Sequence, residues 1–296
     1  MFELFLPFLA LMWRSWQENI SVIPAQIQIA TQPAPRVRVL DVETTAWAQG
    51  VYDMENDTWS LERRSDEPRP IASITKLMAV LTVLSYNPDL SVRIAFTGDD
   101  IVAGGRIYFG SGEQLSREEL LEASLVASDN SAITLLARSV EPHRDAFVAR
   151  MNAVAENLGM VTAHFTDPTG LDPANIASVR DIGKLYGEVL RHNELLAILR
   201  KPETTLTVLN TGRQEHLLAT DWLTDSFLQE DPYTFMGGKT GYLDEAGYCL
   251  VSAVTSGDHT QPIIAIVLGS ESKESRMQEV KSLLWTALTY GVEAIR

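Results

Sequence analysis

The chain has 296 residues, of which 45% are hydrophobic and 21% charged, and its formal net charge is −15. This is the composition of a globular protein, which excludes a disordered chain, and the acidic excess would repel the phosphates of a nucleic acid. Cys249 is the single cysteine and the five histidines lack metal-binding spacing, which excludes an intrachain disulfide and a zinc cluster, so we expect no metal and no other cofactor.

An apolar run begins the chain at residues 2–13 (FELFLPFLALMW). It favours a secretory signal or a short membrane anchor, although no Lys or Arg precedes it and it is shorter than the about 20 residues that span a bilayer. A buried helix or a misplaced start codon is the alternative. Residues 17–35 end in Pro-Ala-Pro, which is typical of a linker. We therefore expect residues 1–35 to be a signal or anchor plus linker, and residues 36–296 to form one folded domain.

The first part of this domain has the pattern of strands. Strands are expected at residues 36–43 and 47–54, and a turn at Asn56-Asp57 leads into a third at residues 58–63. From Ile74 to Leu84 the apolar residues cover nearly every side of a predicted helix, which indicates burial in the middle of the domain.

Helices and then strands follow along the chain. Ser116 to Glu119 form a capping box for a helix through Val126, which Asp129-Asn130 separates from another helix. The remaining expected elements are helices at 132–138, 144–158 and 180–190, strands at 234–243, 248–255 and 262–268, and a final helix at 274–290. Strands at both ends around a helical middle predict an α+β domain, with an antiparallel sheet built from both termini and no second domain.

Ser73 and Lys76 stand three residues apart at the start of the predicted buried helix, so they share one face. A serine hydroxyl becomes a nucleophile when a nearby group takes its proton, and a desolvated lysine beside another cation is neutral enough to do so. The helix amino terminus also offers N–H groups to an oxyanion. The alternative is that Ser73 caps the helix and Lys76 extends to solvent.

Two further motifs complete a set of three. Ser128-Asp129-Asn130 lies at the break between two helices, where a polar turn with a helix cap is the alternative interpretation. Lys239-Thr240-Gly241 lies on a predicted strand after Gly237-Gly238, and paired glycines indicate a strand edge that a ligand or another backbone approaches closely. A surface turn is the alternative there.

The three motifs together are those of class A β-lactamases and penicillin-binding proteins. From about residue 46 to its carboxyl end, the chain resembles the D-alanyl-D-alanine carboxypeptidases and endopeptidases of the low-molecular-mass penicillin-binding proteins. The resemblance implies a β-lactamase/transpeptidase-like fold and a D,D-peptidase catalytic domain over residues 36–296. It is carried by PIASITKLM (70–78), LVASDNSA (125–132), MNAVAENLGM (151–160), HFTDPTGLD (164–172) and GGKTGYLDEAGYCLV (237–251).

The resemblance also implies the roles of the motif residues. Ser73 would attack the carbonyl of the penultimate D-alanine with Lys76 as base, and the backbone N–H groups of Ser73 and Tyr242 would bind the oxyanion. Ser128 would relay the proton to the departing amine. The other expected substrate-binding residues are Asn130 for the peptide backbone, Lys239 with Thr240 for the terminal carboxylate, and Gly241, where a missing side chain would let substrate lie against the strand. Like-charge repulsion from Lys239 would help to keep Lys76 neutral.

The expected substrate is a peptidoglycan stem peptide ending in D-Ala-D-Ala, and β-lactam antibiotics are the expected covalent inhibitors. This chemistry places the protein outside the cytoplasm of a bacterium, and any membrane attachment would be amino-terminal. A carboxypeptidase is the first expectation, because Lys239 and Thr240 favour a free carboxylate. The segment after Lys239 resembles the endopeptidases equally well, so cleavage of cross-links stays open.

The sequence disfavours three alternatives to a serine D,D-peptidase. A class A β-lactamase deacylates through a glutamate and a water, but residues 164–172 contain no Glu-x-x-x-Asn pattern. A catalytically silent, cell-wall-sensing penicillin-recognising domain would usually lose the nucleophile or its base, and this chain keeps both. A metal-dependent peptidase is disfavoured because the sequence lacks a His-Glu-x-x-His motif.

Overall fold

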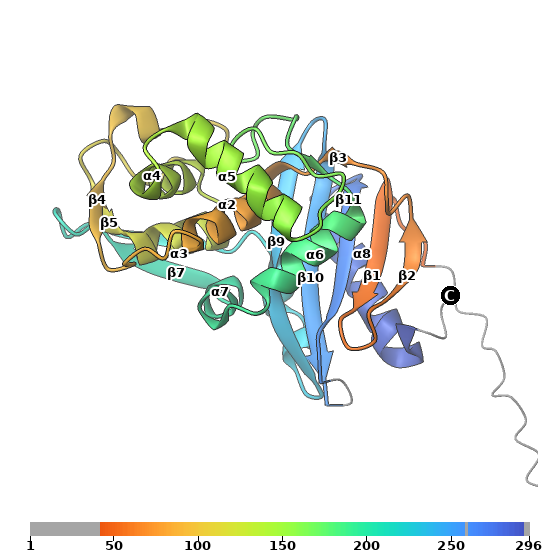
Figure 1. Ribbon diagram of the computed structural model, residues 1–296. Helices are drawn as coiled ribbons and strands as arrows, with labels where there is room; N and C mark the ends of the chain where they lie inside the picture. Colours follow the sequence, from red (N-terminus) through yellow and green to blue (C-terminus); the bar gives the residue numbers. More distant parts are fainter. Residues whose placement is uncertain (1–41, 258–259, 293–296) are drawn as a thin grey trace, which may run out of the picture. The chain divides into compact units, whose positions relative to one another are not determined.

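A five-stranded antiparallel sheet forms the centre of the structure, with the strand order β2-β1-β11-β10-β9 (Figure 1). The structure is a computed structural model, and it describes residues 42–257 and 260–292. The first two strands come from the start of the described chain and the other three from its end, as predicted. The strands are β1 (Ala48–Asp53), β2 (Thr58–Arg63), β9 (Tyr233–Leu243), β10 (Gly247–Ser256) and β11 (Ile263–Ser270).

β11 is the middle strand, and it is buried along nearly its whole length. It pairs with β1 through Val51 and Ala265, and with β10 through Val251 and Ile266. Helix α8 (Lys273–Tyr290) contacts β10 and β11, and α6 (Val179–Val189) contacts β1 and β11 (Figure 1). Because helices cover both faces, the β11 sequence IIAIVLGS is almost continuously apolar instead of alternating.

The helical middle of the chain packs on one side of the sheet (Figure 1). Helix α2 is at its centre, where nine of its ten residues are buried, as its apolar pattern predicted. The other helices of this part are α3 (Arg117–Val126), α4 (Asn130–Val140), α5 (Arg144–Asn157) and α7 (Asn193–Leu199), and α2 itself spans Thr75–Leu84.

Local sequence signals set the ends of these helices. Ser116 accepts a hydrogen bond from the Glu119 backbone and the Glu119 side chain accepts one in return, which is the predicted capping box. Asp129 caps α4 through Ala132, so α4 begins two residues earlier than predicted. Ser178 caps α6 as predicted.

Several predictions differ from the structure. Of the strand expected at residues 36–43, only residues 42 and 43 are described, and they are not in a strand. The proposed leader and linker, residues 1–35, lie outside the described residues. The sequence analysis missed α7 and several short strands, which are β3 (Arg69–Pro70), β4 (Arg93–Ala95), β5 (Gln114–Ser116), β6 (Ile176–Ala177), β7 (Glu203–Thr207) and β8 (Gln214–Leu218).

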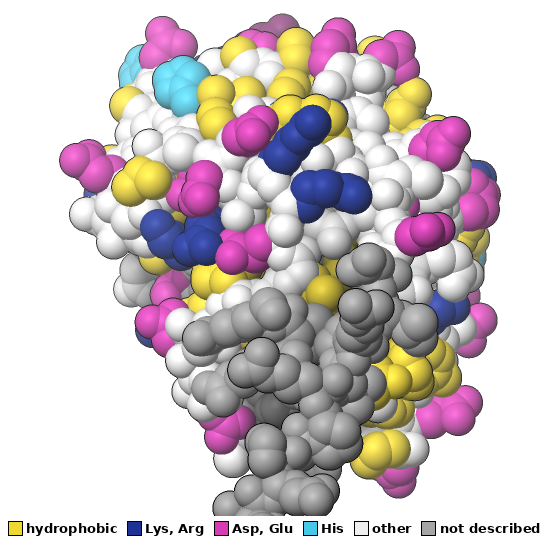
Figure 2. Space-filling model, turned by 90° about the vertical axis from the view of Figure 1, so that its right-hand side faces the viewer, with side chains coloured by type: hydrophobic (Ala, Val, Ile, Leu, Met, Phe, Trp, Pro, Cys, Tyr) yellow, Lys and Arg dark blue, Asp and Glu magenta, His cyan; other side chains and the backbone are white. Residues whose placement is uncertain are grey.

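The surface agrees with the acidic composition. On the part of the face in Figure 2 that grey atoms do not cover, Asp and Glu side chains are scattered widely and Lys and Arg form only small groups. In the part of the chain that the structure describes, no helix combines the length and the apolar character needed to cross a bilayer.

Candidate active site

Ser73 and Lys76 meet at the start of α2. Ser73 lies in the short 3-10 helix η1 (Ala72–Ile74) that leads into α2, and Lys76 is in the first turn of α2. Lys76 Nζ lies 2.9 Å from Ser73 Oγ, within hydrogen-bond distance. Lys76 is fully buried, so the alternative of a lysine extended to solvent is wrong.

Two more acceptors surround Lys76 Nζ. The side-chain oxygen of Asn130 lies 2.7 Å away and the backbone carbonyl of Thr169 lies 2.8 Å away. An ammonium group donates to all three partners, whereas a neutral amine has two hydrogens and one lone pair. Loss of one proton therefore leaves Lys76 Nζ able to keep the bonds to Asn130 and Thr169 and to accept the hydroxyl proton of Ser73.

Burial lowers the pKa of Lys76 to about 7, although the carboxylates of Asp129 and Asp167 oppose the shift. A substantial fraction of this lysine is then neutral at physiological pH. We expected the charge of Lys239 to lower the pKa of Lys76. In the structure it is the pKa of Lys239 that is lowered, first by burial and then by the charge of Lys76.

The Thr169 carbonyl is held in place by a loop that the sequence analysis did not single out for this role. The buried Asp167 carboxylate accepts hydrogen bonds from the backbone N–H groups of Thr169, Gly170 and Asp172 at 2.6 to 2.9 Å. It also accepts one from Asn175 Nδ2 at 2.8 Å. In the sequence, this loop stands out only because residues 164–172 resemble the D,D-peptidases. The role of a backbone carbonyl does not depend on the residue type, so no sequence pattern predicts it.

The second motif approaches the third. Lys239 is buried, and its Nζ donates to Ser128 Oγ at 2.8 Å and to the Thr240 carbonyl at 2.9 Å. Ser128 has a φ of 59°, and Ala72, just before Ser73, has a φ of 49°. Non-glycine residues in this region are strained, and such strain concentrates at functional sites. The second motif thus lies between the two lysines: Asn130 bonds to Lys76, and Ser128 bonds to Lys239.

Strand β9, which carries Lys239, is the last strand in the sheet order. Thr240 Oγ1 donates to Thr220 Oγ1 at 2.6 Å. Tyr242 is 48% exposed, and its ring packs 4.3 Å from that of Tyr248. A free strand edge presents backbone N–H and C=O groups that an extended peptide can pair with.

Gly241 has a neighbour that the sequence analysis did not anticipate. A Cβ at this position would lie 2.6 Å from the Ile71 carbonyl oxygen and 3.2 Å from the Ser73 backbone nitrogen. The missing side chain therefore lets β9 approach the backbone that carries Ser73, in addition to any substrate that lies along the strand. This contact places the Ser73 N–H beside the residue that precedes Tyr242.

Two buried charged residues behind β9 were not predicted. Arg276 of α8 donates to the Gly241 carbonyl at 2.9 Å. Asp221 precedes the 3-10 helix η3 (Trp222–Asp225) and accepts a hydrogen bond from the Leu223 N–H at 2.9 Å. In the sequence neither residue stands in a motif, so only the fold brings them to the site.

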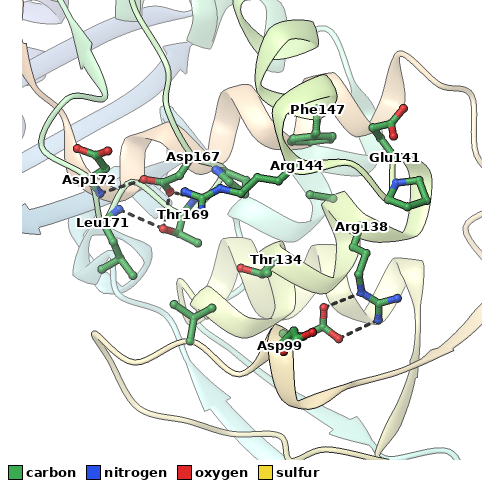
Figure 3. Close-up of a pocket in the computed structure, with 15 residues that line it drawn as sticks. Asp99, Thr134, Arg138, Glu141, Arg144, Phe147, Asp167, Thr169, Leu171 and Asp172 are labelled. Atoms are coloured by element: carbon green, nitrogen blue, oxygen red, sulfur yellow. Dashed lines mark hydrogen bonds and ion pairs between the residues drawn. The ribbon is translucent and has the colours of Figure 1, made fainter.

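A separate cavity of about 480 Å³ lies beyond the 167–172 loop (Figure 3). Phe147 and Leu171 are among its apolar lining residues, and the Arg138–Asp100 ion pair, with 2.7 Å between its closest atoms, is part of its wall. Thr169 also lines this cavity, whereas Ser73, Lys76 and Lys239 do not. These three motif residues therefore lie outside it.

Within the described ranges, no group of three or more His, Cys, Asp or Glu residues is arranged to hold a metal ion. The arrangement instead has a serine hydroxyl, a buried lysine of lowered pKa and a second buried lysine beside a free strand edge. It is suited to acyl transfer from a peptide whose carboxylate binds near Lys239.

Comparisons with known proteins agree with this chemistry. A family model described as "D-alanyl-D-alanine carboxypeptidase" matches residues 39–272. The chain is 32% identical to a D-alanyl-D-alanine endopeptidase of Haemophilus influenzae, covering 79% of each protein, and 27% identical to the D-alanyl-D-alanine carboxypeptidase DacF of Bacillus subtilis, covering 80% of this chain and 61% of that protein.

The fold is also that of a solved penicillin-binding protein. The structure of penicillin-binding protein D2 from Listeria monocytogenes with bound cefotaxime superposes with a TM-score of 0.72 at 27% identity, covering 83% of this chain and 98% of that one. The predicted α+β, transpeptidase-like fold is therefore confirmed.

Proposed function

This chain belongs to the D-alanyl-D-alanine carboxypeptidase family, serine peptidases that act on peptidoglycan, and we propose that Ser73 is the nucleophile with which it cleaves D-Ala-D-Ala peptides. The observation that carries the proposal is the 2.9 Å contact between Ser73 Oγ and the buried Lys76 Nζ. Neutral Lys76 takes the hydroxyl proton as Ser73 Oγ attacks the carbonyl of the penultimate D-alanine.

The remaining roles follow from the geometry around this pair. The backbone N–H groups of Ser73 and Tyr242 stabilise the oxyanion. Ser128, which is bonded to Lys239, relays to the departing amine the proton that Lys76 took from Ser73, and Asn130 binds the peptide backbone while it orients Lys76. Water then hydrolyses the acyl ester and restores the Ser73 hydroxyl.

Lys239 and Thr240 bind the carboxylate of the substrate, and Gly241 lets the strand lie close to Ser73. A peptide ending in D-alanine supplies this carboxylate, which supports a carboxypeptidase. A cross-link to the D-centre of a diamino diacid also leaves a free carboxylate next to the scissile bond. The carboxylate site alone is therefore compatible with either reaction.

Cleavage of cross-links is a second candidate activity, favoured by the comparisons. The Haemophilus influenzae endopeptidase is 32% identical to this chain, against 27% for the carboxypeptidase DacF. The free edge of β9 would accept a branched peptide, since Tyr242 is exposed there.

A β-lactam would acylate Ser73 in the same way as the peptide and stay attached. Rapid lactam hydrolysis in class A enzymes needs a glutamate that activates water. In the described structure, the three groups bonded to Lys76 Nζ are a hydroxyl, an amide oxygen and a backbone carbonyl, and none is a carboxylate. This supports a peptidase that β-lactams inhibit over a β-lactamase.

The family's action on peptidoglycan places the enzyme outside the cytoplasm. We propose that residues 2–13 direct it there as a signal or hold it at the membrane as an anchor. Mass spectrometry of the amino terminus of the exported protein tests this, because a cleaved signal removes the run and an anchor keeps it.

Incubation with a stem pentapeptide and with a cross-linked dimer tests the function. Release of free D-alanine from the pentapeptide supports the carboxypeptidase, and conversion of dimer to monomer supports the endopeptidase. Loss of neither substrate, together with rapid penicillin hydrolysis, would replace both with a β-lactamase.

A further inference from the structure

The cavity beyond the 167–172 loop takes no part in the mechanism above (Figure 3). Its volume of about 480 Å³ lies in the range of small-molecule sites, which is about 300 to 1,000 Å³. Ala137, Phe147 and Leu171 give it a largely apolar lining, and it is partly open to solvent. An apolar cavity of this size is a candidate binding site.

Acidic residues outnumber basic ones around this cavity. Five acidic residues and two arginines are in the lining, namely Asp99, Asp100, Glu141, Asp167, Asp172, Arg138 and Arg144. Arg138 is already paired with Asp100, with 2.7 Å between their closest atoms. The excess of negative charge around the cavity favours a cationic ligand over an anionic one.

Two of these carboxylates each have an oxygen available to a ligand. Figure 3 shows Asp172 at one end of the cavity and Glu141 at the other. Glu141 Oε1 accepts from the His143 N–H and Asp172 Oδ1 from the Ala174 N–H, both at 2.9 Å. Neither carboxylate has an ion-pair partner among the described residues, so the second oxygen of each can accept from an ammonium group.

Arg144 is the cation that opposes such a ligand. It is the first residue of α5, it is exposed, and it forms no ion pair with another described residue. Its single charge is outweighed by those of Asp99, Glu141 and Asp172, and its exposure lets the guanidinium group turn towards solvent. The lining therefore still favours a cation.

The wall of the cavity includes groups that orient Lys76. Thr169 lines the cavity, and its carbonyl accepts from Lys76 Nζ at 2.8 Å. Thr134 also lines it, and its hydroxyl donates to the Asn130 carbonyl at 2.8 Å. The side-chain oxygen of Asn130 in turn accepts from Lys76 Nζ at 2.7 Å. Thus one of these two acceptors belongs to the wall, and the other is bonded to it.

The loop before β5 connects the same wall to Asn130 by packing. A Cβ on Gly104 would lie 2.6 Å from Leu171 Cδ2 and 3.4 Å from Asn130 Nδ2, so the loop fits closely against both residues. Val102 lines the cavity, and its N–H donates to Ser131 Oγ at 3.0 Å. A ligand that packs against Leu171 and Val102 therefore contacts the immediate surroundings of Asn130.

We propose that this cavity binds a small apolar ligand that carries an ammonium group, and that the bound ligand acts on Lys76 through Thr169 and Asn130. The apolar lining holds the hydrocarbon part, and the carboxylates of Glu141 and Asp172 attract the ammonium group. A ligand packed against Thr169 keeps its carbonyl directed at Lys76, so we expect faster acylation. The effect on acylation rests on the proposed roles of Ser73 and Lys76, whereas binding does not.

Isothermal titration calorimetry with three probes of equal length tests the binding site. The probes are 3-phenylpropylammonium, 3-phenylpropanol and 3-phenylpropanoate, which share a hydrocarbon part and differ in charge. We expect the ammonium probe to bind about fivefold more tightly than the alcohol, and the anion to bind most weakly. Equal affinities for all three probes, or no binding of the ammonium probe, would overturn the proposal.

Ala137→Leu shows whether the probes bind in this cavity. Ala137 lines it and is 5% exposed, so a larger side chain there occupies the space of the ligand. We expect the affinities for the ammonium probe and the alcohol to fall together by about tenfold. Wild-type affinities in the folded variant would place the binding site elsewhere.

A double variant, Glu141→Gln with Asp172→Asn, tests the charge of the site without filling it. The new amide oxygens keep the backbone hydrogen bonds of the two carboxylates. We expect the preference for the ammonium probe over the alcohol to disappear and the affinity for the alcohol to stay. The matched control is Glu118→Gln with Glu156→Gln, which removes two exposed charges outside the lining. A preference that persists in the first variant, or that disappears in both, would refute a cation site in the cavity.

Stopped-flow labelling with a fluorescent penicillin tests the effect on Lys76. At a saturating concentration of the ammonium probe, the wild type should acylate about fivefold faster, and Ala137→Leu should not respond. If calorimetry shows binding and the wild-type rate stays the same or falls, the coupling to Lys76 is wrong. A wild type that penicillin does not label at all would refute the proposed function and leave the binding result unaffected.

Discussion

Lys76 donates to Ser73 within one turn of the same helix, with 2.9 Å between Nζ and Oγ. The proposed nucleophile and its proposed base are therefore held together by local helix geometry, while the groups that bond to Lys76, Asn130 and Thr169, come from elsewhere in the chain. Changes to the pair should act on chemistry, and changes to its surroundings should act on both chemistry and stability.

Ser73→Ala should abolish covalent labelling by a fluorescent penicillin, because the variant lacks the hydroxyl that we propose forms the acyl ester. The circular dichroism spectrum should match that of the wild type, since the lost hydroxyl accepts only from Lys76. Ser85→Ala, at the other end of α2, is the control and should label normally. Undiminished labelling of Ser73→Ala would remove Ser73 as the nucleophile.

The acylation rate should rise with pH through about 7 and then level off. The pKa of Lys76 is lowered to about 7 by burial, and only the neutral amine accepts the Ser73 proton, so activity is lost as pH falls below that value. Lys76→Ala should acylate at least about 100-fold more slowly and lose this dependence. Stopped-flow labelling at several pH values measures both, and wild-type rates in the variant would exclude Lys76 as the base.

Lys239→Ala should weaken the enzyme's preference for a free carboxylate. The wild type should cleave a D-Ala-D-Ala peptide far better than its carboxyl-terminal amide, and the variant should treat the two more equally because the cation is gone. The loss should be about 10- to 100-fold in kcat/KM for the acid. A variant that keeps the full preference would place the carboxylate site elsewhere.

Gly241→Ala should reduce acylation by about tenfold or more, because its Cβ would lie 2.6 Å from the Ile71 carbonyl and push β9 away from Ser73. Gly257→Ala is a matched control on the turn after β10, where a Cβ would meet nothing within 4 Å. Penicillin labelling and thermal melting should be unchanged in the control. Normal labelling of Gly241→Ala would show that the close approach has no catalytic role.

Asp167→Asn should lower the free energy of unfolding by about 3 kcal/mol, because an amide nitrogen cannot accept the bonds that the carboxylate receives from Asp172 and Asn175. Burial alone would raise the pKa of Asp167, but bonds from Thr169, Asp172 and Gly170 outweigh it and lower the pKa. The folded carboxylate thus contributes stability above the ordinary pKa, and this is lost as pH falls through the lower folded value. Urea unfolding at neutral and acid pH should show a larger acid loss in the wild type than in the variant.

The elements with strong local signals were predicted well. Strand β2 was placed at its observed ends, and the buried α2, the capped α3 and the strands β9, β10 and β11 lie within a few residues of their predicted ends. The sequence did not predict the β7–β8 hairpin, because its two strands are only five residues long and are half exposed, so they carry a weak apolar pattern.

The sequence predicted only those parts of the site that consist of reactive or charged side chains in recognisable motifs. Ser73, Lys76, Ser128 and Lys239 stand in motifs, whereas the Thr169 carbonyl acts through its backbone and leaves no mark in the sequence. Asp221 and Arg276 reach the site because η3 and α8 pack beside β9 and β10, a tertiary relationship that no periodicity reveals. The sequence also explained only part of why residue 241 is a glycine. The backbone that its missing side chain makes room for belongs to Ile71, which is distant in the sequence.

The pairing of β1 with β11 has a consequence for how the enzyme is made. Ala48 of β1 pairs with Leu268 of β11. More than two hundred residues must therefore be synthesised after β1 before its partner strand β11 is available. At about 5 to 20 residues per second this takes ten seconds or more on a ribosome. Lys239 likewise emerges long after Ser73, so neither the sheet nor the catalytic pairings can be complete in a nascent chain. The folded sheet therefore requires the chain at least through β11, and until that strand is available the edge of β1 needs protection from aggregation.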